Sequence, residues 1–176
     1  TYTNLAISTS IARDEGILKR LLGTPLPPPV YLAGRVGSAV SIAFVAVVLM
    51  LGVGVLAYGV EVRAELLPAA IVTFAVGVVA FAALGLAIAG LAQSSDSAQA
   101  LANFTILPLA FVSDVFVAIA DPPGWLETIG DVFPLKHFVR SFQDAFSPFT
   151  TAPGFRWGSL AVIAAWGVFG MVVAMR

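Results

Sequence analysis

Long apolar stretches alternate with short polar segments along the chain. The residues from Gly37 to Ala57 include no charged side chain, and as a helix they are long enough to cross about 30 Å of hydrocarbon. Three further stretches show a similar pattern, although Pro108 interrupts one of them. We therefore expect an all-α membrane protein, a polytopic helical bundle, with four spans at Leu32–Tyr58, Leu67–Ala92, Ala98–Ala120 and Trp157–Met175.

Two shorter segments border these spans. Residues 1–12 carry no charge but are too few to cross a bilayer, so we interpret them as the last turns of a span whose beginning is missing. The sequence is therefore expected to be a fragment. Between the second and third spans, Gln93–Ser97 predicts a tight turn, with Asp96 or Ser97 as the cap of the next helix.

A polar segment, residues 13–31, precedes the first complete span. Its apolar side chains recur at helical spacing between charged ones, which predicts a short amphipathic helix in this segment. Gly23 and Pro25 should end this helix. Such a helix lies in the headgroup layer or contacts a partner protein, and amphipathicity alone does not distinguish the two. The apolar side chains are those of Ile17, Leu18, Leu21 and Leu22, and the charged ones those of Arg13, Asp14, Glu15, Lys19 and Arg20.

Residues 121–150 form neither a clean span nor a simple loop. Pro123 and Pro134 divide them into two short amphipathic pieces, Trp125–Phe133 and Leu135–Phe146. Short, half-apolar pieces separated by proline are typical of re-entrant or interfacial helices. We expect both helices at the outer face, where they enter the membrane without crossing it.

Composition and charge agree with a membrane protein and limit its partners. Hydrophobic residues make up 59% of the 176 residues and charged residues only 11%, about half the share in a soluble domain. The net charge of -1 argues against a nucleic-acid partner. Lys and Arg are denser around residues 13–35 than in the segments on the opposite side, so the positive-inside rule places residues 13–31 in the cytoplasm.

No residue pattern predicts catalysis or a metal site. The sequence has one histidine, His137, no cysteine and no phosphate-binding glycine loop, and we expect an ordinary interfacial role for His137. Asp114 stands near a span end, where a carboxylate is costly unless it faces a cavity, a partner or water. It either lines a substrate path, paired with Lys136 or Arg140, or lies beyond the membrane boundary. The phenylalanines nearby are interpreted as a packing or interface stripe: Phe133, Phe138, Phe142, Phe146 and Phe149.

Two blocks of the sequence carry recognisable motifs. Residues 13–25 follow the pattern Arg-Glu-x-Gly-Thr-Leu-x-x-Leu-x-x-Thr-Pro in most positions. Residues 107–116 follow a Leu-Pro-x-x-Phe pattern, residues 123–126 read Pro-Gly-Trp-Leu, and residues 133–140 follow an Asn-Pro-Leu pattern that ends in Arg. In order and spacing these blocks resemble the ABC-2 type exporter permeases over nearly the whole chain. Asp114 departs from the usual Gly, and Phe133 from the usual Asn.

The resemblance implies six spans per subunit, dimers of permeases in the cell (inner or plasma) membrane, and a separate cytoplasmic ABC ATPase that binds ATP and magnesium. It implies export of a hydrophobic or amphipathic substrate of the drug, lipid or glycan class, with membrane lipid around the spans and no catalytic residue or cofactor in this chain. The implied coupling helix docks on the ATPase through Glu15, Ile17, Leu18, Lys19, Arg20, Leu21 and Leu22. The implied substrate path or extracellular re-entrant gate contains Asp114, Phe116, Trp125, Pro134, Lys136 and Arg140.

An ATP-independent membrane transporter, or a structural membrane subunit, is the alternative. A secondary transporter should carry ionisable residues in the middle of its spans. The stretches Gly37–Ala57, Leu67–Ala92 and Trp157–Met175 contain none, which favours the exporter. Co-purification of an ATPase with the full-length protein would separate the two hypotheses.

Overall fold

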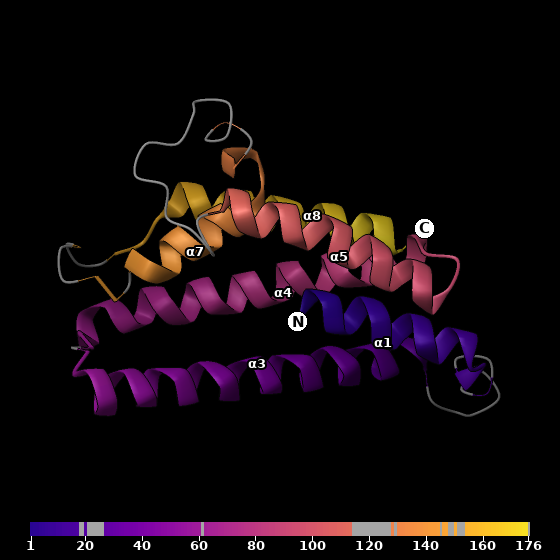
Figure 1. Cartoon of the computed structure of the whole chain (residues 1–176), viewed down its shortest axis with the longest axis horizontal. Helices are drawn as coiled ribbons and strands as arrows, with labels where there is room; N and C mark the ends of the chain where they lie inside the picture. The colour runs from indigo at the N-terminus through magenta and orange to yellow at the C-terminus, as the bar shows by residue number, and fades with distance from the viewer. Residues whose placement is uncertain are drawn as a thin grey trace.

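The computed structural model describes residues 1–17, 20, 27–60, 62–113, 128, 130–144, 146–147, 150 and 154–175. The regular structure of these residues is helical throughout, which confirms the predicted all-α class (Figure 1). The helices, labelled as in Figure 1, are α1 (Tyr2–Asp14), α3 (Pro28–Tyr58), the short 3-10 helix η1 (Ala64–Leu66), α4 (Leu67–Leu91), α5 (Ser95–Val112), α7 (Pro134–Asp144) and α8 (Trp157–Ala174).

Three helices in this part of the chain are long and apolar enough to cross a membrane: Val30–Tyr58, Ala64–Leu91 and Trp157–Ala174. They overlap the first, second and fourth predicted spans. α3 begins earlier than predicted because proline is well tolerated in the first helical turn, where its missing N–H has no partner to lose. α5 has 18 residues, and residues 114–120 of the third predicted span lie outside the described residues. That span stays a prediction.

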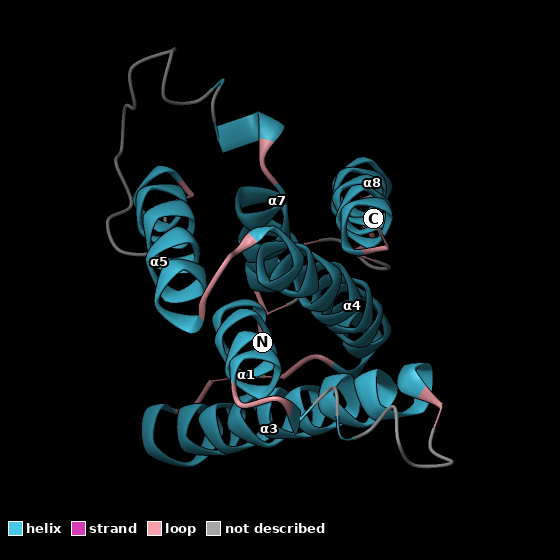
Figure 2. Ribbon diagram, turned by 90° about the vertical axis from the view of Figure 1, so that its right-hand side faces the viewer, coloured by secondary structure: helices cyan, strands magenta, loops and turns pink. Residues whose placement is uncertain are grey.

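Helix α4 lies at the centre of the bundle, with α1 on one side and α7 and α8 on the other (Figure 2). Its most extensive contact is with α8, and glycines of α8 make the close approach possible. A Cβ at Gly170 would lie 2.8 Å from the backbone nitrogen of Leu84, and one at Gly167 would lie 3.0 Å from the Cα of Ala80. The two helices therefore pack backbone to backbone along this α4–α8 seam.

Helix α1 is buried against both α4 and α5. Leu5 and Ala6 are 1% and 0% exposed. A Cβ at Gly85 of α4 would lie 2.5 Å from the backbone oxygen of Tyr2, so the two helices touch at this crossing. Ala102 of α5 packs into the same buried cluster as Tyr2 and Ala6. The residues that follow α1 are thus attached to a helix held in the core.

Helix α3 runs along one edge of the molecule, below α1 and α4 in Figure 1. Only 6% of its most apolar stretch is buried, against 44% for the stretch in η1 and α4. Ala39 is buried where α3 meets Leu5 and Ala82. The outward side carries large apolar side chains, among them Ile42, Leu49, Met50 and Leu56. This surface has the character of one that faces lipid.

Several helix ends meet at each end of the bundle (Figure 1). The end of α1, the start of α3, the turn between α4 and α5, and the end of α8 lie together, and we call this the coupling end. The opposite end holds the end of α3, the start of α4, the end of α7 and the start of α8, and we call it the outer end. The sequence-based orientation predicts that the coupling end is cytoplasmic.

Candidate functional site

The predicted coupling segment, residues 13–31, begins with a break in the helix. Glu15 caps α1, and Gly16 follows with a φ of 72°, a left-handed conformation that glycine adopts without steric cost. Ile17 and Arg20 are helical again, and the Arg20 amide donates to the Gly16 carbonyl at 3.1 Å. Glu15 therefore belongs to the cap of α1 and not to the coupling helix that the resemblance implies at about Glu15 to Leu22. The other predicted docking residues lie outside the described residues: Leu18, Lys19, Leu21 and Leu22.

The turn between α4 and α5 is closed by two serines. Ser94 is the N-cap of α5: its hydroxyl accepts from the Ser97 amide at 3.2 Å, and the Ser97 hydroxyl accepts from the Ser94 amide at 2.9 Å. The N-cap is therefore Ser94 rather than Asp96 or Ser97, and Ser97 takes part as the second residue of this reciprocal capping box. It also leaves the amide of Ser95, in the first turn of α5, for another acceptor.

Arg13 and Asp14 connect the end of α1 to this turn. The Asp14 carboxylate accepts from the Ser95 amide at 2.6 Å, and the Arg13 guanidinium donates to the Ala89 carbonyl at 2.9 Å. The Arg13 Nε and the Asp14 Oδ1 are 3.6 Å apart. The hydrogen bond from Ser95 is the main reason that the pKa of Asp14 lies below its ordinary value. Sequence reasoning assigned no such contact to either residue.

At the start of α7, Lys136 is buried and paired. Its side chain is 3% exposed, and its ammonium donates to the Asp131 carboxylate at 2.8 Å. Gly130 makes room for it, since a Cβ there would lie 2.7 Å from the Lys136 Cδ and 3.1 Å from the Val112 carbonyl oxygen. The hydrogen bond from Lys136 is the main cause that lowers the pKa of Asp131, and the nearby charge of Arg140 acts in the same direction. The lysine thus joins α7 to the residues that precede it.

His137 and Trp166 fix the same region to α8. The Nε2 of His137 lies 2.8 Å from the Asp131 carbonyl and its Nδ1 lies 3.1 Å from the Ser159 hydroxyl. A carbonyl only accepts, so Nε2 carries the proton and the Ser159 hydroxyl donates to Nδ1. The Trp166 indole donates to the Val132 carbonyl at 2.8 Å. These contacts give His137 a structural role.

The structure brings together only part of the predicted path or gate. Pro134, Lys136 and Arg140 lie on α7, where Pro134 and Lys136 are buried and Arg140 is half-buried. The remaining predicted residues, Asp114, Phe116 and Trp125, lie outside the described residues, and so the pairing of Asp114 with Lys136 or Arg140 stays a prediction. Asp131 was missed as a partner of Lys136, although an acid five residues earlier, across the break at Pro134, was a usable signal.

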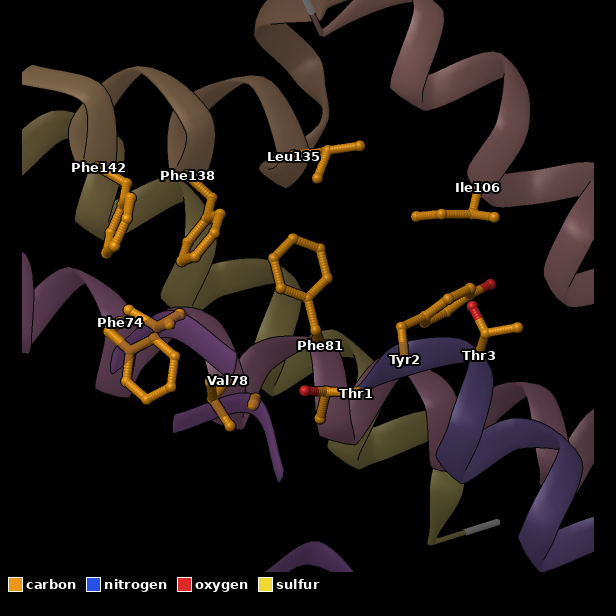
Figure 3. Close-up of a pocket in the computed structure, with 12 residues that line it drawn as sticks. Thr1, Tyr2, Thr3, Phe74, Val78, Phe81, Ile106, Leu135, Phe138 and Phe142 are labelled. Carbon is orange, nitrogen blue, oxygen red and sulfur yellow. The ribbon is translucent and has the colours of Figure 1, made fainter. Parts of the chain in front are cut away.

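An apolar cavity that is open to the surface lies between α1, α3, α4, α5 and α7, next to the first residues of α1 (Figure 3). Its volume is about 380 Å³. Aromatic rings from α4 and α7 line one side: the rings of Phe81 and Phe138 meet edge to face at 5.6 Å, and those of Phe138 and Phe142 stack at 5.8 Å. The phenylalanine stripe of α7 therefore packs on α4 and borders a space that can accept an apolar group.

The chain is similar to known membrane transport proteins. The family described as ABC-2 type transporter matches residues 1–147. The inner membrane transport permease YadH of Escherichia coli (strain K12) is 23% identical over 152 residues, which cover 86% of this chain and 59% of that protein. The YadH permease of Shigella flexneri matches to the same extent. The chain thus spans about three fifths of the length of these relatives. No solved structure matches it.

Proposed function

Because the chain belongs to the ABC-2 type transporter family, we propose that it is the permease subunit of an ATP-driven exporter. It is a multi-pass protein of the inner or plasma membrane and forms a dimer with itself or with a related permease. ATP and magnesium bind to a separate cytoplasmic ABC ATPase. The subunit moves a hydrophobic or amphipathic substrate of the drug, lipid or glycan class out of the cytoplasm.

The observation that carries this proposal is the arrangement of the coupling end. The predicted docking segment continues directly from α1, whose Leu5 and Ala6 are buried in the core. Arg13 and Asp14, at its beginning, contact α4 and α5. A partner that binds this segment therefore acts on helices of the core. This arrangement supports a subunit that is driven from the cytoplasmic side.

The interior supports an apolar or amphipathic substrate. The 380 Å³ cavity is lined mainly by aromatic and aliphatic side chains. Burying apolar groups there is favourable, whereas a strongly polar substrate would lose its hydrogen bonds to water without replacement. An apolar or amphipathic group is therefore a better fit to this lining than a strongly polar one. The predicted path or gate continues toward α7, with Pro134, Lys136 and Arg140 on that helix.

The test uses the full-length permease together with the ATPase that co-purifies with it. Inside-out vesicles that contain both are supplied with an amphipathic fluorescent dye, and dye uptake is measured with ATP, without nucleotide and with a non-hydrolysable ATP analogue. We expect dye uptake with ATP, and no uptake without nucleotide or with the analogue. Uptake that needs no ATP and disappears when an ionophore collapses the ion gradients would overturn it in favour of an ATP-independent transporter.

A further inference from the structure

Two adjacent residues of α1 contact two opposite helix ends. The Arg13 guanidinium reaches the carbonyl of Ala89 in the last turn of α4, and the Asp14 carboxylate reaches the amide of Ser95 in the first turn of α5. The last carbonyls and the first amides of a helix have no partner within that helix. Each contact therefore fills a vacant position at the α4–α5 turn.

The charges match these helix ends. A helix carries partial positive charge at its N-terminus and partial negative charge at its C-terminus. Arg13 places a cation at the negative end of α4, and Asp14 places an anion at the positive end of α5. The two side chains also lie 3.6 Å apart and so orient each other. Exchanging the two residues would place both charges at the wrong helix end.

The other end of the coupling segment has a different environment. Arg35, in the second turn of α3, donates to the Tyr31 hydroxyl at 2.6 Å and lies 5.1 Å from the centre of the Tyr31 ring. Both contacts stay within α3, and most of that helix is exposed. Among the described residues, polar contacts from the coupling segment to the core are therefore made on the α1 side.

We infer that Arg13 and Asp14 are positioning residues that form a joint between the coupling segment and the α4–α5 turn. Because of this joint, a displacement that reaches the end of α1 moves α1, α4 and α5 together. The inference rests on the proposed function, in which an ATPase acts on the coupling segment. It adds that binding of the ATPase and transmission of its motion depend on different residues.

The first experiment separates binding from transmission. Arg13→Ala and Asp14→Ala are introduced into the full-length permease, with Arg13→Lys and Asp14→Asn as conservative versions that keep the fold where the alanine variants do not. The control is Asp96→Asn, which alters an exposed acid of the same turn that has no hydrogen bond or ion pair among the described residues. For each variant, co-purification of the ATPase and ATP-dependent dye uptake are measured.

We expect each joint variant, that is, each substitution at Arg13 or Asp14, to retain the ATPase while dye uptake falls about fivefold or more. A fivefold fall corresponds to the low end of typical coupling energies. The control should retain both. Unchanged uptake in the joint variants would overturn the inference alone. Loss of the ATPase together with uptake would also overturn it, because the residues would then act in docking. A wild-type permease that neither retains an ATPase nor shows ATP-dependent uptake would overturn the proposed function, and the inference with it.

A covalent version of the joint supplies a readout that a general structural role would not move. The Ser95 side chain, as well as its amide, hydrogen-bonds the Asp14 carboxylate. Asp14→Cys and Ser95→Cys therefore place two thiols beside this contact, in a sequence that has no cysteine of its own. The reduced double variant should lose uptake like Asp14→Ala, and oxidation to the disulfide should restore it. Oxidation that forms the disulfide without restoring uptake would contradict transmission through this contact.

Discussion

At the residue scale, two glycines define how α1 is placed. Gly16 has a left-handed backbone with open space around the position of a Cβ, whereas Gly85 is helical and touches the backbone of Tyr2. The first glycine is required by its conformation and the second by lack of space. Substitution by alanine should therefore destabilise the protein at both positions for different reasons.

Gly16→Ala should lower the free energy of unfolding by about 1 kcal/mol, because alanine in a left-handed conformation is strained. Gly34→Ala is the matched control: Gly34 also has open space around it but lies in helical α3, so alanine should raise stability by about 0.5–1 kcal/mol. Unfolding of the purified protein in detergent measures both. Equal shifts of the same sign would contradict the assigned backbone conformation.

Gly85→Ala should cost about 1–3 kcal/mol, because the added methyl group would lie 2.5 Å from the Tyr2 oxygen and force α1 away from α4. Gly90→Ala lies in the same helix with nothing within 4 Å and should not destabilise the protein. Thermal unfolding of the two variants side by side measures the difference. If Gly85→Ala were as stable as Gly90→Ala, α1 could not cross α4 at this point.

Asp131 supplies a pH dependence next to the start of α7. Its pKa is lowered by the hydrogen bond from Lys136, so the ionised form stabilises the folded state. That contribution is complete above the ordinary pKa of 3.8 and is lost as pH falls through the lower folded-state value. The difference in unfolding midpoint between wild type and Asp131→Asn should be constant from about pH 5 to 8 and shrink below about pH 4.

At the scale of single elements, the apolar stretches located most of the helices. The predicted spans at Leu32–Tyr58, Leu67–Ala92 and Trp157–Met175 overlap α3, α4 and α8 closely, because a run of apolar residues without charge leaves few alternatives in a membrane. The boundaries near polar residues were less accurate. α5 begins at Ser95 and not at the predicted Ala98, because the Ser94–Ser97 capping box sets the start of the helix.

The coupling segment yields a prediction that belongs to this scale. Leu18→Ala or Leu21→Ala should weaken association with the ATPase by about 1–3 kcal/mol, because buried apolar anchors carry most of the affinity of an interface. Lys19→Ala should weaken it less, and this smaller effect should fall with added salt. ATPase co-purification at low and high salt measures all three variants. Unchanged association throughout would mean that the segment only contacts lipid.

At the scale of the whole molecule, sequence reasoning could not identify the contacts that join distant segments. Arg13 and Ala89 are 76 residues apart, and Asp14 and Ser95 are 81 residues apart. Each residue has an ordinary local role as a charge near a helix end, and only the crossing of α1 over α4 brings the pairs together. Trp166 of α8 is a second example of a contact between distant segments, because its indole reaches the Val132 carbonyl 34 residues away.

Two exposed glutamines test the orientation of the bundle. Gln93 lies in the α4–α5 turn at the coupling end, and Gln143 lies near the end of α7 at the outer end. With an impermeant thiol reagent added to intact cells, Gln143→Cys should be labelled and Gln93→Cys should not. In inside-out vesicles the result should reverse. Labelling of both from one side would contradict the predicted orientation and the outer location of α7.

Within the part of the chain that the structure describes, α3 is held at few points, so we expect its tilt to respond to bilayer thickness. The part of α3 after Arg35, residues 36–58, has 23 residues and is about 35 Å long, whereas the 18 residues of α8 extend about 27 Å. Both cannot match one hydrocarbon layer, and the longer helix adapts by tilting. α8 is held by the α4–α8 seam, while α3 is held at few points, so the mismatch falls on α3. Lipids with shorter acyl chains would therefore increase the angle between α3 and α4, beside the aromatic cavity.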